Sequence, residues 1–185
     1  VNHLGHFALT GLLLPRLLAS PESRIVTVSS IAHRGGRINF ENFRGEKGYR
    51  ANREYSQSKL ANLLFTFELH RRLRANGIEH LRSLAAHPGM SQTDLTRHNA
   101  LSAFFAPLVC QSPAMGALPT LYAATHMDAY SGDYIGPNGI FEFRGTPKAV
   151  NCTRTAQNRE LAAKLWDVSE QLSGVEYAFT NSSAG

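Results

Sequence analysis

The residues best suited to acid–base chemistry are Tyr55 and Lys59, which lie four positions apart at the start of a helix-forming run. On a helix, residues at this spacing share one face, so the phenol and the ammonium can reach the same space. A free phenol ionises at about pH 10, and a neighbouring cation stabilises its phenolate. The pair can therefore protonate an alkoxide or deprotonate an alcohol.

Two further polar residues lie near predicted element ends. Ser30 follows the β-branched run from Arg24 to Ser29, which predicts a buried strand. Ligands of open α/β sheets bind outside the carboxyl ends of the strands, so the Ser30 hydroxyl is well placed to contact a substrate oxygen. Taken alone, Ser30 could be a turn serine, and Asn2 could be an ordinary helix cap.

The elements that would position these residues start with a helix over residues 2–19. It is apolar nearly all round, which predicts burial on several sides, and Pro15 predicts a kink. Residues 32–51 read as a long loop, a kind of segment that usually serves a site. A helix over residues 52–75 carries Tyr55 and Lys59 on its first turns, and Gly77 ends it.

A second strand is predicted over residues 80–86, stopped by the run His87-Pro88-Gly89. A strand, a helix and another strand form a unit whose sheet is parallel, so the fold class is α/β. A lid is expected over residues 90–99 and 103–109, with Phe104, Phe105 and Leu108 suggesting an apolar pocket. A helix over 113–125, a strand and turn over 134–139, and an amphipathic helix over 157–173 complete the chain.

Composition favours one globular domain: the 185 residues are 43% hydrophobic and 18% charged. The net charge of +5 comes from dispersed arginines, so no nucleic-acid partner is expected. Cys110 and Cys152 are far apart and read as free thiols in a reducing compartment, the cytoplasm. No stretch reads as a membrane span, and His3 and His6 lack the further ligands that a metal site needs.

The chain begins with Val1 and contains no GxGxxG phosphate-binding loop. We therefore expect the C-terminal portion of a longer protein, with residues 1–178 in one domain and 179–185 as a flexible tail. Such a piece would expose an unpaired sheet edge.

Four ordered motifs resemble the short-chain dehydrogenase/reductase superfamily. They are the opening Asn2 to Phe7, the strand end Val26 to Ser30, the run Tyr55 to Asn62, and His87-Pro88-Gly89 with Thr93. The opening and the SKLANLLFTFEL run look most like the retinol dehydrogenase and WW-domain oxidoreductase branch, including its bacterial members. The spacing of 25 positions between Ser30 and Tyr55 agrees with that branch. The resemblance implies the C-terminal portion of a Rossmann-like, doubly wound parallel sheet.

The resemblance also implies roles for individual residues. Tyr55 would be the general acid/base, and Lys59 would stabilise its phenolate while holding the nicotinamide ribose. Ser30 would bind the substrate oxygen, and Asn2 would position a water that relays protons to Lys59. The nicotinamide end of the cofactor would contact Pro88, Gly89 and Thr93.

The implied activity is hydride transfer between NAD or NADP, with NADP slightly favoured, and a small apolar alcohol or carbonyl compound. The family also suggests a homodimer or homotetramer formed through helices 2–19 and 52–75. Two other functions stay open. One is an epimerase or dehydratase that uses the same Tyr and Lys, and the other is a cofactor-free, non-catalytic interaction module.

Overall fold

The computed structural model describes residues 1–43, 46–90 and 111–179. Their strands form one sheet in the order β1-β2-β3-β4. The strands are β1 (Ser23–Val28), β2 (Leu81–Ala86), β3 (Tyr134–Pro137) and β4 (Pro147–Ala149). The first three run parallel, as the sequence predicts, and the unpredicted β4 pairs antiparallel with β3.

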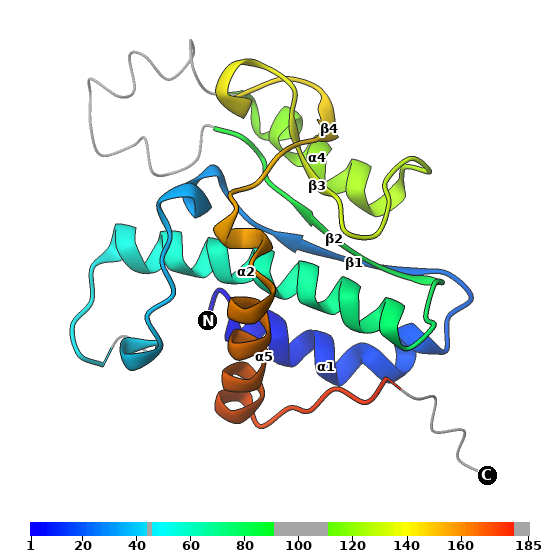
Figure 1. The fold of residues 1–185 in the computed structure, drawn as a ribbon. Coiled ribbons are helices and arrows are strands. Elements are labelled where there is room, and N and C mark those ends of the chain that lie inside the picture. The colour runs from blue at the N-terminus through cyan, green and yellow to red at the C-terminus, as the bar shows by residue number, and fades with distance from the viewer. Residues whose placement is uncertain (44–45, 91–110, 180–185) are drawn as a thin grey trace.

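Helices cover both faces of this sheet (Figure 1). α1 (Leu4–Leu18) and α2 (Ala51–Ala75) lie on one face, and α4 (Pro113–Thr125) lies on the other. α5 (Arg159–Ser173) packs across α1 and α2 on their outer side. This mixed α/β arrangement confirms the predicted Rossmann-like class.

The strands send alternate side chains to the two faces, as the period of a strand requires. In β2, Leu84 and Ala86 pack toward α4, whereas Ala85 packs toward α2. In β3, Ile135 joins the α4 side and Tyr134 the α2 side. A sheet covered on both faces buries successive positions of a strand, which explains why Leu84, Ala85 and Ala86 at the end of β2 are all buried.

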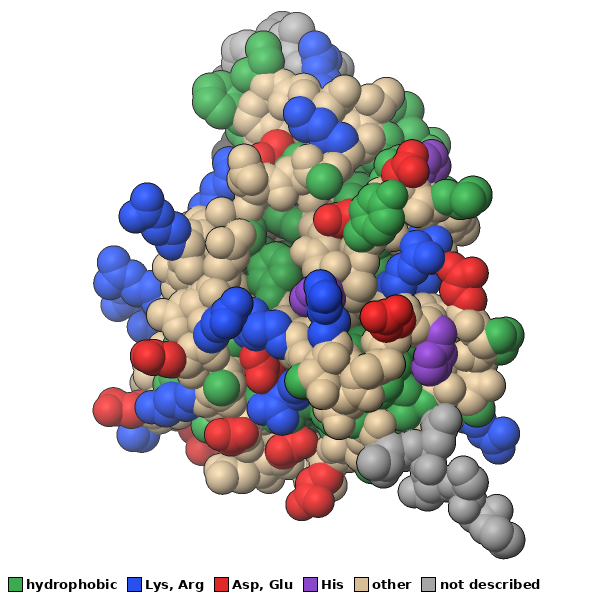
Figure 2. Space-filling model, turned by 45° about the vertical axis from the view of Figure 1, so that its right-hand side comes forward, with side chains coloured by type: hydrophobic (Ala, Val, Ile, Leu, Met, Phe, Trp, Pro, Cys, Tyr) green, Lys and Arg blue, Asp and Glu red, His purple; other side chains and the backbone are tan. Residues whose placement is uncertain are grey.

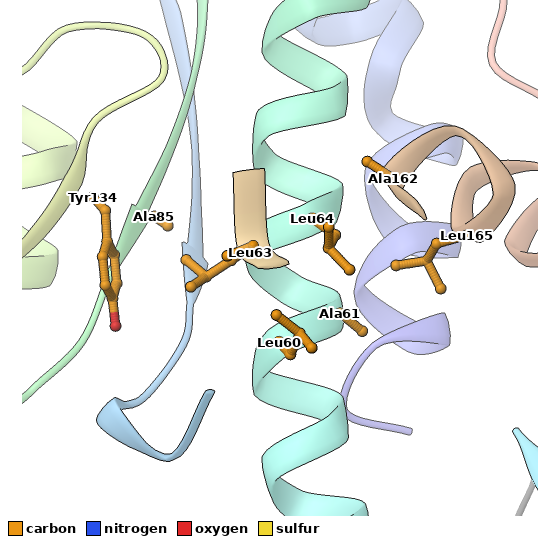
Figure 3. Close-up of a cluster of buried hydrophobic side chains, with 9 residues drawn as sticks. Leu60, Ala61, Leu63, Leu64, Ala85, Tyr134, Ala162 and Leu165 are labelled. Carbon is orange, nitrogen blue, oxygen red and sulfur yellow. The ribbon is translucent and has the colours of Figure 1, made fainter. Parts of the chain in front are cut away.

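α2 is the central helix of the core because it is covered on two sides. Figure 3 shows Leu63 pointing toward Ala85 on β2, while Leu64 points toward Leu165 on α5. All four side chains are at most 1% exposed. Gly77, just beyond the helix, has φ +70, which confirms its predicted role as a C-terminal glycine.

Aromatic rings join α1, α2 and α5. The Phe7 ring lies 5.1 Å from the Trp166 ring and 4.8 Å from the Tyr177 ring, centre to centre. Phe65 stacks on Trp166, and the Tyr177 hydroxyl donates a hydrogen bond to the Phe7 carbonyl at 2.6 Å. These contacts fix α1 against α2 and therefore fix Asn2, at the head of α1, relative to Tyr55.

One side of α1 is open to solvent, so the prediction that this helix is buried on several sides is wrong. Leu9, Leu12 and Leu13 are 57%, 69% and 46% exposed, whereas Phe7 and Leu14 are buried. The sheet, α2 and α5 cover the side of α1 that carries Phe7 and Leu14. The side that carries Leu9, Leu12 and Leu13 is left uncovered.

The remaining boundaries follow local hydrogen bonds. The predicted loop over residues 32–51 contains two short 3-10 helices, η1 (Ile31–Gly35) and η2 (Phe40–Asn42). The Ser112 hydroxyl caps α4 as predicted. α5 begins later than predicted, at Arg159, because the Asn158 side chain caps it there. α1 continues through Pro15.

Some predictions fall on residues 91–110 and 180–185, outside the described residues. They include Thr93, Cys110 and the lid with Phe104, Phe105 and Leu108. Cys152 is a free thiol. Among the helices of the described ranges, none has the length and apolar character that crossing a bilayer requires.

The face in Figure 2 shows how charge is distributed. Its Lys and Arg side chains lie among Asp and Glu side chains. A continuous basic stripe, the usual footprint of nucleic-acid binding, is therefore not seen on this face among the residues described.

Candidate active site

The structure brings Tyr55 and Lys59 together on the first turns of α2. The Lys59 ammonium lies 5.5 Å from the centre of the Tyr55 ring and donates a hydrogen bond to the Val28 carbonyl at 3.2 Å. Burial lowers the pKa of Lys59. The Tyr55 side chain remains accessible, with the residue 41% exposed. A cation thus sits beside an accessible phenol at the carboxyl end of β1.

The two serines after β1 have different partners. The buried Ser29 hydroxyl donates to the Lys59 carbonyl at 2.8 Å, tying the strand end to α2. Ser30 caps η1, and its hydroxyl accepts a hydrogen bond from the Ala32 amide at 3.2 Å. In this structure Ser30 has the contact of a turn serine, and its second lone pair and its proton are left for other partners.

Asn2 and Tyr55 line the same surface hollow, whose volume is about 380 Å³. His3, rather than Asn2, occupies the capping position of α1, and no side chain caps that position. Asn2 therefore does not serve as the ordinary helix cap that its sequence position allowed. Phe43 and Tyr49 add aromatic surface to the hollow.

Pro88 and Gly89 follow β2 at the same edge of the sheet as Ser30. Val28 pairs in register with Ala86 in parallel strands, so both strands end side by side. Gly89 has φ +67, and a Cβ atom there would lie 2.5 Å from the Phe143 carbonyl oxygen. Only glycine fits this turn without a shift of the neighbouring backbone.

Asn62 is a site residue that the sequence reasoning missed. Its amide donates to the Val28 carbonyl at 3.0 Å, so this oxygen accepts from both Asn62 and Lys59. The His6 ring lies 3.5 Å from the same amide, and burial together with the charge of Lys59 lowers the pKa of His6. The helical spacing of three residues between Lys59 and Asn62 was the available signal.

His87 lies next to the Pro88–Gly89 turn and is fully buried. The prediction that it packs or caps locally is confirmed, because its Nδ1 accepts a hydrogen bond from the Gly89 amide at 3.2 Å. Its other nitrogen contacts Glu142, a residue with no sequence motif to mark it.

His3 and His6 are the histidines that the sequence analysis considered as metal ligands. His3 contacts Ser169 and His6 contacts Asn62. Within residues 1–43, 46–90 and 111–179, no group of three or more His, Cys, Asp or Glu side chains is placed to hold a metal ion.

No family model matches the chain. Comparison with curated proteins finds relatives that are named retinol dehydrogenases. Human retinol dehydrogenase 11 is 41% identical in an alignment of 184 positions that covers 95% of this chain and 53% of that protein. Mouse retinol dehydrogenase 13 is 40% identical in an alignment of 190 positions that covers 96% of this chain and 53% of that protein. The chain spans about half the length of the curated relatives it matches.

Among solved structures, an uncharacterized protein from Mycobacterium paratuberculosis superposes with a TM-score of 0.75 at 47% identity. The match covers 96% of this chain and 58% of that one. The fold, the ordered motifs and the sustained identity to retinol dehydrogenases agree. The chain therefore belongs to the short-chain dehydrogenase/reductase superfamily, in the branch of the retinol dehydrogenases.

Proposed function

We propose that the protein containing this chain is an NAD(P)-dependent oxidoreductase that interconverts an apolar alcohol and its carbonyl compound. The observation that carries the proposal is the Lys59 ammonium 5.5 Å from the ring centre of the accessible Tyr55, at the carboxyl edge of a parallel sheet. This edge is where α/β proteins bind nucleotides and substrates.

In the proposed reaction, Tyr55 moves the proton of the substrate hydroxyl. A positive charge at Lys59 stabilises the phenolate that accepts this proton. Ser30 donates a hydrogen bond to the substrate oxygen, using the proton that its contact with Ala32 leaves free. Asn2, in the same hollow as Tyr55, holds a water through which Lys59 exchanges protons with solvent.

The residues after β2 fit the nicotinamide end of the cofactor. The turn at Gly89 follows β2 at the same edge of the sheet as Ser30 and the first turns of α2. Pro88 and Gly89 would hold that end, together with Thr93, and Lys59 would hold the ribose. When bound, NAD or NADP supplies or accepts the hydride. The phosphates would need residues beyond this chain, since it lacks a glycine-rich loop.

The names of the relatives suggest the substrate class. Retinol is a long apolar alcohol, and the hollow beside Tyr55 is lined in part by Phe43, Tyr49 and Leu4. We propose an apolar alcohol of this kind, with NADP as the slightly preferred cofactor. For the location we propose a reducing compartment such as the cytoplasm.

We also propose a homodimer or homotetramer, with a modified interface. The family resemblance implied pairing through residues 2–19 and 52–75, but α5 of the same chain packs on α2 and on part of α1. The exposed leucines Leu9, Leu12 and Leu13 are the part of that surface still open to a partner.

Fluorescence titration with NADH and NADPH tests the proposal. The chain is measured alone and in a longer protein that also carries the glycine-rich half of a retinol dehydrogenase. We expect the longer protein to bind one nucleotide and reduce members of a panel of apolar aldehydes. Binding without turnover of alcohols or carbonyls, but with epimerisation or dehydration, would favour the epimerase alternative. Failure to bind either nucleotide would favour the non-catalytic interaction module.

A further inference from the structure

Glu142 connects two segments of the candidate site from outside every sequence motif. Its carboxylate accepts a hydrogen bond from His87 Nε2 at 3.1 Å and another from the Arg34 guanidinium at 2.7 Å. These partners lie 55 and 108 positions away in the sequence. His87 directly precedes the Pro88–Gly89 turn, and Arg34 lies in η1, which the Ser30 side chain caps.

The His87 ring is held in one tautomer. Its Nδ1 accepts from the Gly89 amide, so the proton of the neutral ring sits on Nε2 and is donated to Glu142. Burial lowers the pKa of His87 to about 4, which keeps the ring neutral near pH 7. Gly136 lies against the ring so closely that a Cβ there would clash with it. The ring therefore has one position and one hydrogen-bonding pattern.

The backbone at Glu142 is strained in a way that fits this contact. Phe141 and Glu142 have φ values of +54 and +59, in the left-handed region that side chains disfavour. Strained residues persist where the surroundings fix them, and they cluster at functional sites. Here the strain turns the Glu142 carboxylate inward, leaving the side chain only 18% exposed, while Phe141 is 71% exposed.

The backbone that carries Arg34 is held by close packing, while the Arg34 side chain itself is 42% exposed. η1 is capped by Ser30 and followed by Gly36, where a Cβ would lie 2.5 Å from the Ser56 carbonyl of α2. η1 is therefore braced against the helix turn that carries Tyr55. On the other side, the Met90 amide donates to the Phe143 carbonyl at 2.8 Å, which joins the Gly89 turn to the backbone next to Glu142.

We propose that Glu142, with His87 and Arg34, is a positioning residue that sets the Pro88–Gly89 turn against the Ser30 segment. The inference rests on the proposed function. In that reaction the Ser30 segment holds the substrate oxygen and the Gly89 turn faces the nicotinamide. The distance between these two segments decides whether the reacting atoms meet in productive geometry, and small displacements there are costly.

The structural claim is tested by NMR on the chain itself. Glu142→Gln keeps the shape and removes the charge, and we expect it to shift the amide resonances of both Gly89 and Ala32. Arg34→Gln is expected to shift Gly89, which Arg34 reaches through Glu142 and His87 in the described contacts. Glu176→Gln, at an exposed carboxylate after α5, should leave both amides in place.

The nitrogen shifts of the His87 ring give an independent readout. The wild-type ring is expected to carry its proton on Nε2. A proton on Nδ1, or a Gly89 amide unchanged in both Glu142→Gln and Arg34→Gln, would overturn the inference whether or not the protein has oxidoreductase activity.

The kinetic claim is tested in the longer protein that binds the cofactor. Glu142→Gln should lower kcat roughly tenfold or more, with a much smaller change in KM, because positioning is lost and substrate binding is retained. Arg34→Gln should also lower kcat, and Arg34→Lys, which keeps the positive charge, should lower kcat less than Arg34→Gln does. An unchanged kcat in Glu142→Gln would contradict the positioning role. Absence of turnover in the wild type would contradict the proposed function. The amide shifts of Gly89 and Ala32 would then still show whether Glu142 couples the Pro88–Gly89 turn to the Ser30 segment.

Discussion

The Ser29 hydroxyl donates a hydrogen bond to the Lys59 carbonyl at 2.8 Å, linking the end of β1 to the first turns of α2. The link is reinforced from the opposite direction, since the Lys59 ammonium donates to the Val28 carbonyl. Strand end and helix are therefore held together where, in the proposed reaction, Tyr55 and Ser30 act on one substrate oxygen.

Ser29→Ala should weaken this lock. Ser29 is 1% exposed, so the loss of its hydrogen bond is expected to lower the free energy of unfolding by about 1 kcal/mol. Urea denaturation measures this free energy. Ser20→Ala removes an exposed hydroxyl-to-carbonyl hydrogen bond and should change the free energy of unfolding by less than about 0.5 kcal/mol. Equal effects of the two substitutions would show that the Ser29 hydrogen bond stabilises the fold no more than an exposed one.

Gly89→Ala and Gly77→Ala form a matched pair. Both glycines have left-handed backbones, with φ +67 and +70, but a Cβ at position 77 meets open space. Gly77→Ala should cost about 1 kcal/mol of conformational energy. Gly89→Ala should cost more, since its Cβ would also press on the Phe143 carbonyl. Thermal unfolding compares them, and a smaller loss for Gly89→Ala would mean that the turn is not tightly packed.

The core role of α2 predicts a large effect at Leu63, which is 0% exposed. Leu63→Ala should lower the free energy of unfolding by about 2–5 kcal/mol, the usual range for a buried leucine. Leu12→Ala, at a residue 69% exposed, should cost less than about 0.5 kcal/mol in the monomer. If Leu12→Ala is strongly destabilising and the loss depends on protein concentration, α1 is an interface between copies.

His3 should make the fold sensitive to acid. Burial lowers its pKa from 6.5 to about 4, and His6 and the N-terminus act in the same direction, while the interaction with Asn62 raises the pKa. The unfolded chain therefore binds the proton first, so stability falls as the pH drops from about 6.5 to about 4. One proton corresponds to a slope of at most about 1.4 kcal/mol per pH unit.

His3→Gln removes this proton-linked loss. Its stability curve should run parallel to that of the wild type at neutral pH and fall less steeply below about pH 6. Denaturant unfolding at several pH values gives both slopes. Identical slopes for the two proteins would show that His3 is not protonated differently in the folded and unfolded chains.

Local patterns predicted most of the fold because the core elements carry their own signals. The β-branched run of β1, the apolar end of β2 and the glycine after α2 all lie where the sequence places them. β4 escaped prediction because its three residues, Pro147 to Ala149, are too few to show a period. The exposed leucines of α1 escaped because periodicity shows apolar surface but not which neighbour covers it.

The candidate site likewise has a part that local sequence patterns predict and a part that they do not. Tyr55 and Lys59 share one helix, so their spacing alone predicted the contact that the structure shows. The link from Glu142 to His87 and Arg34 joins residues far apart in sequence, and no local spacing encodes it. The inward turn of the Glu142 carboxylate depends on a left-handed backbone at a non-glycine residue, which sequence rules disfavour.

The most direct test of the central claim is the turnover of Tyr55→Phe in the longer, cofactor-binding protein. Tyr130→Phe, at a tyrosine 63% exposed on the segment before β3, is the control. If Tyr55 moves the substrate proton, its loss should lower kcat by about 10²- to 10⁴-fold while the dissociation constant for the nucleotide stays within a few-fold of the wild type. If Tyr55→Phe and Tyr130→Phe both keep the wild-type kcat, Tyr55 is not the general acid/base.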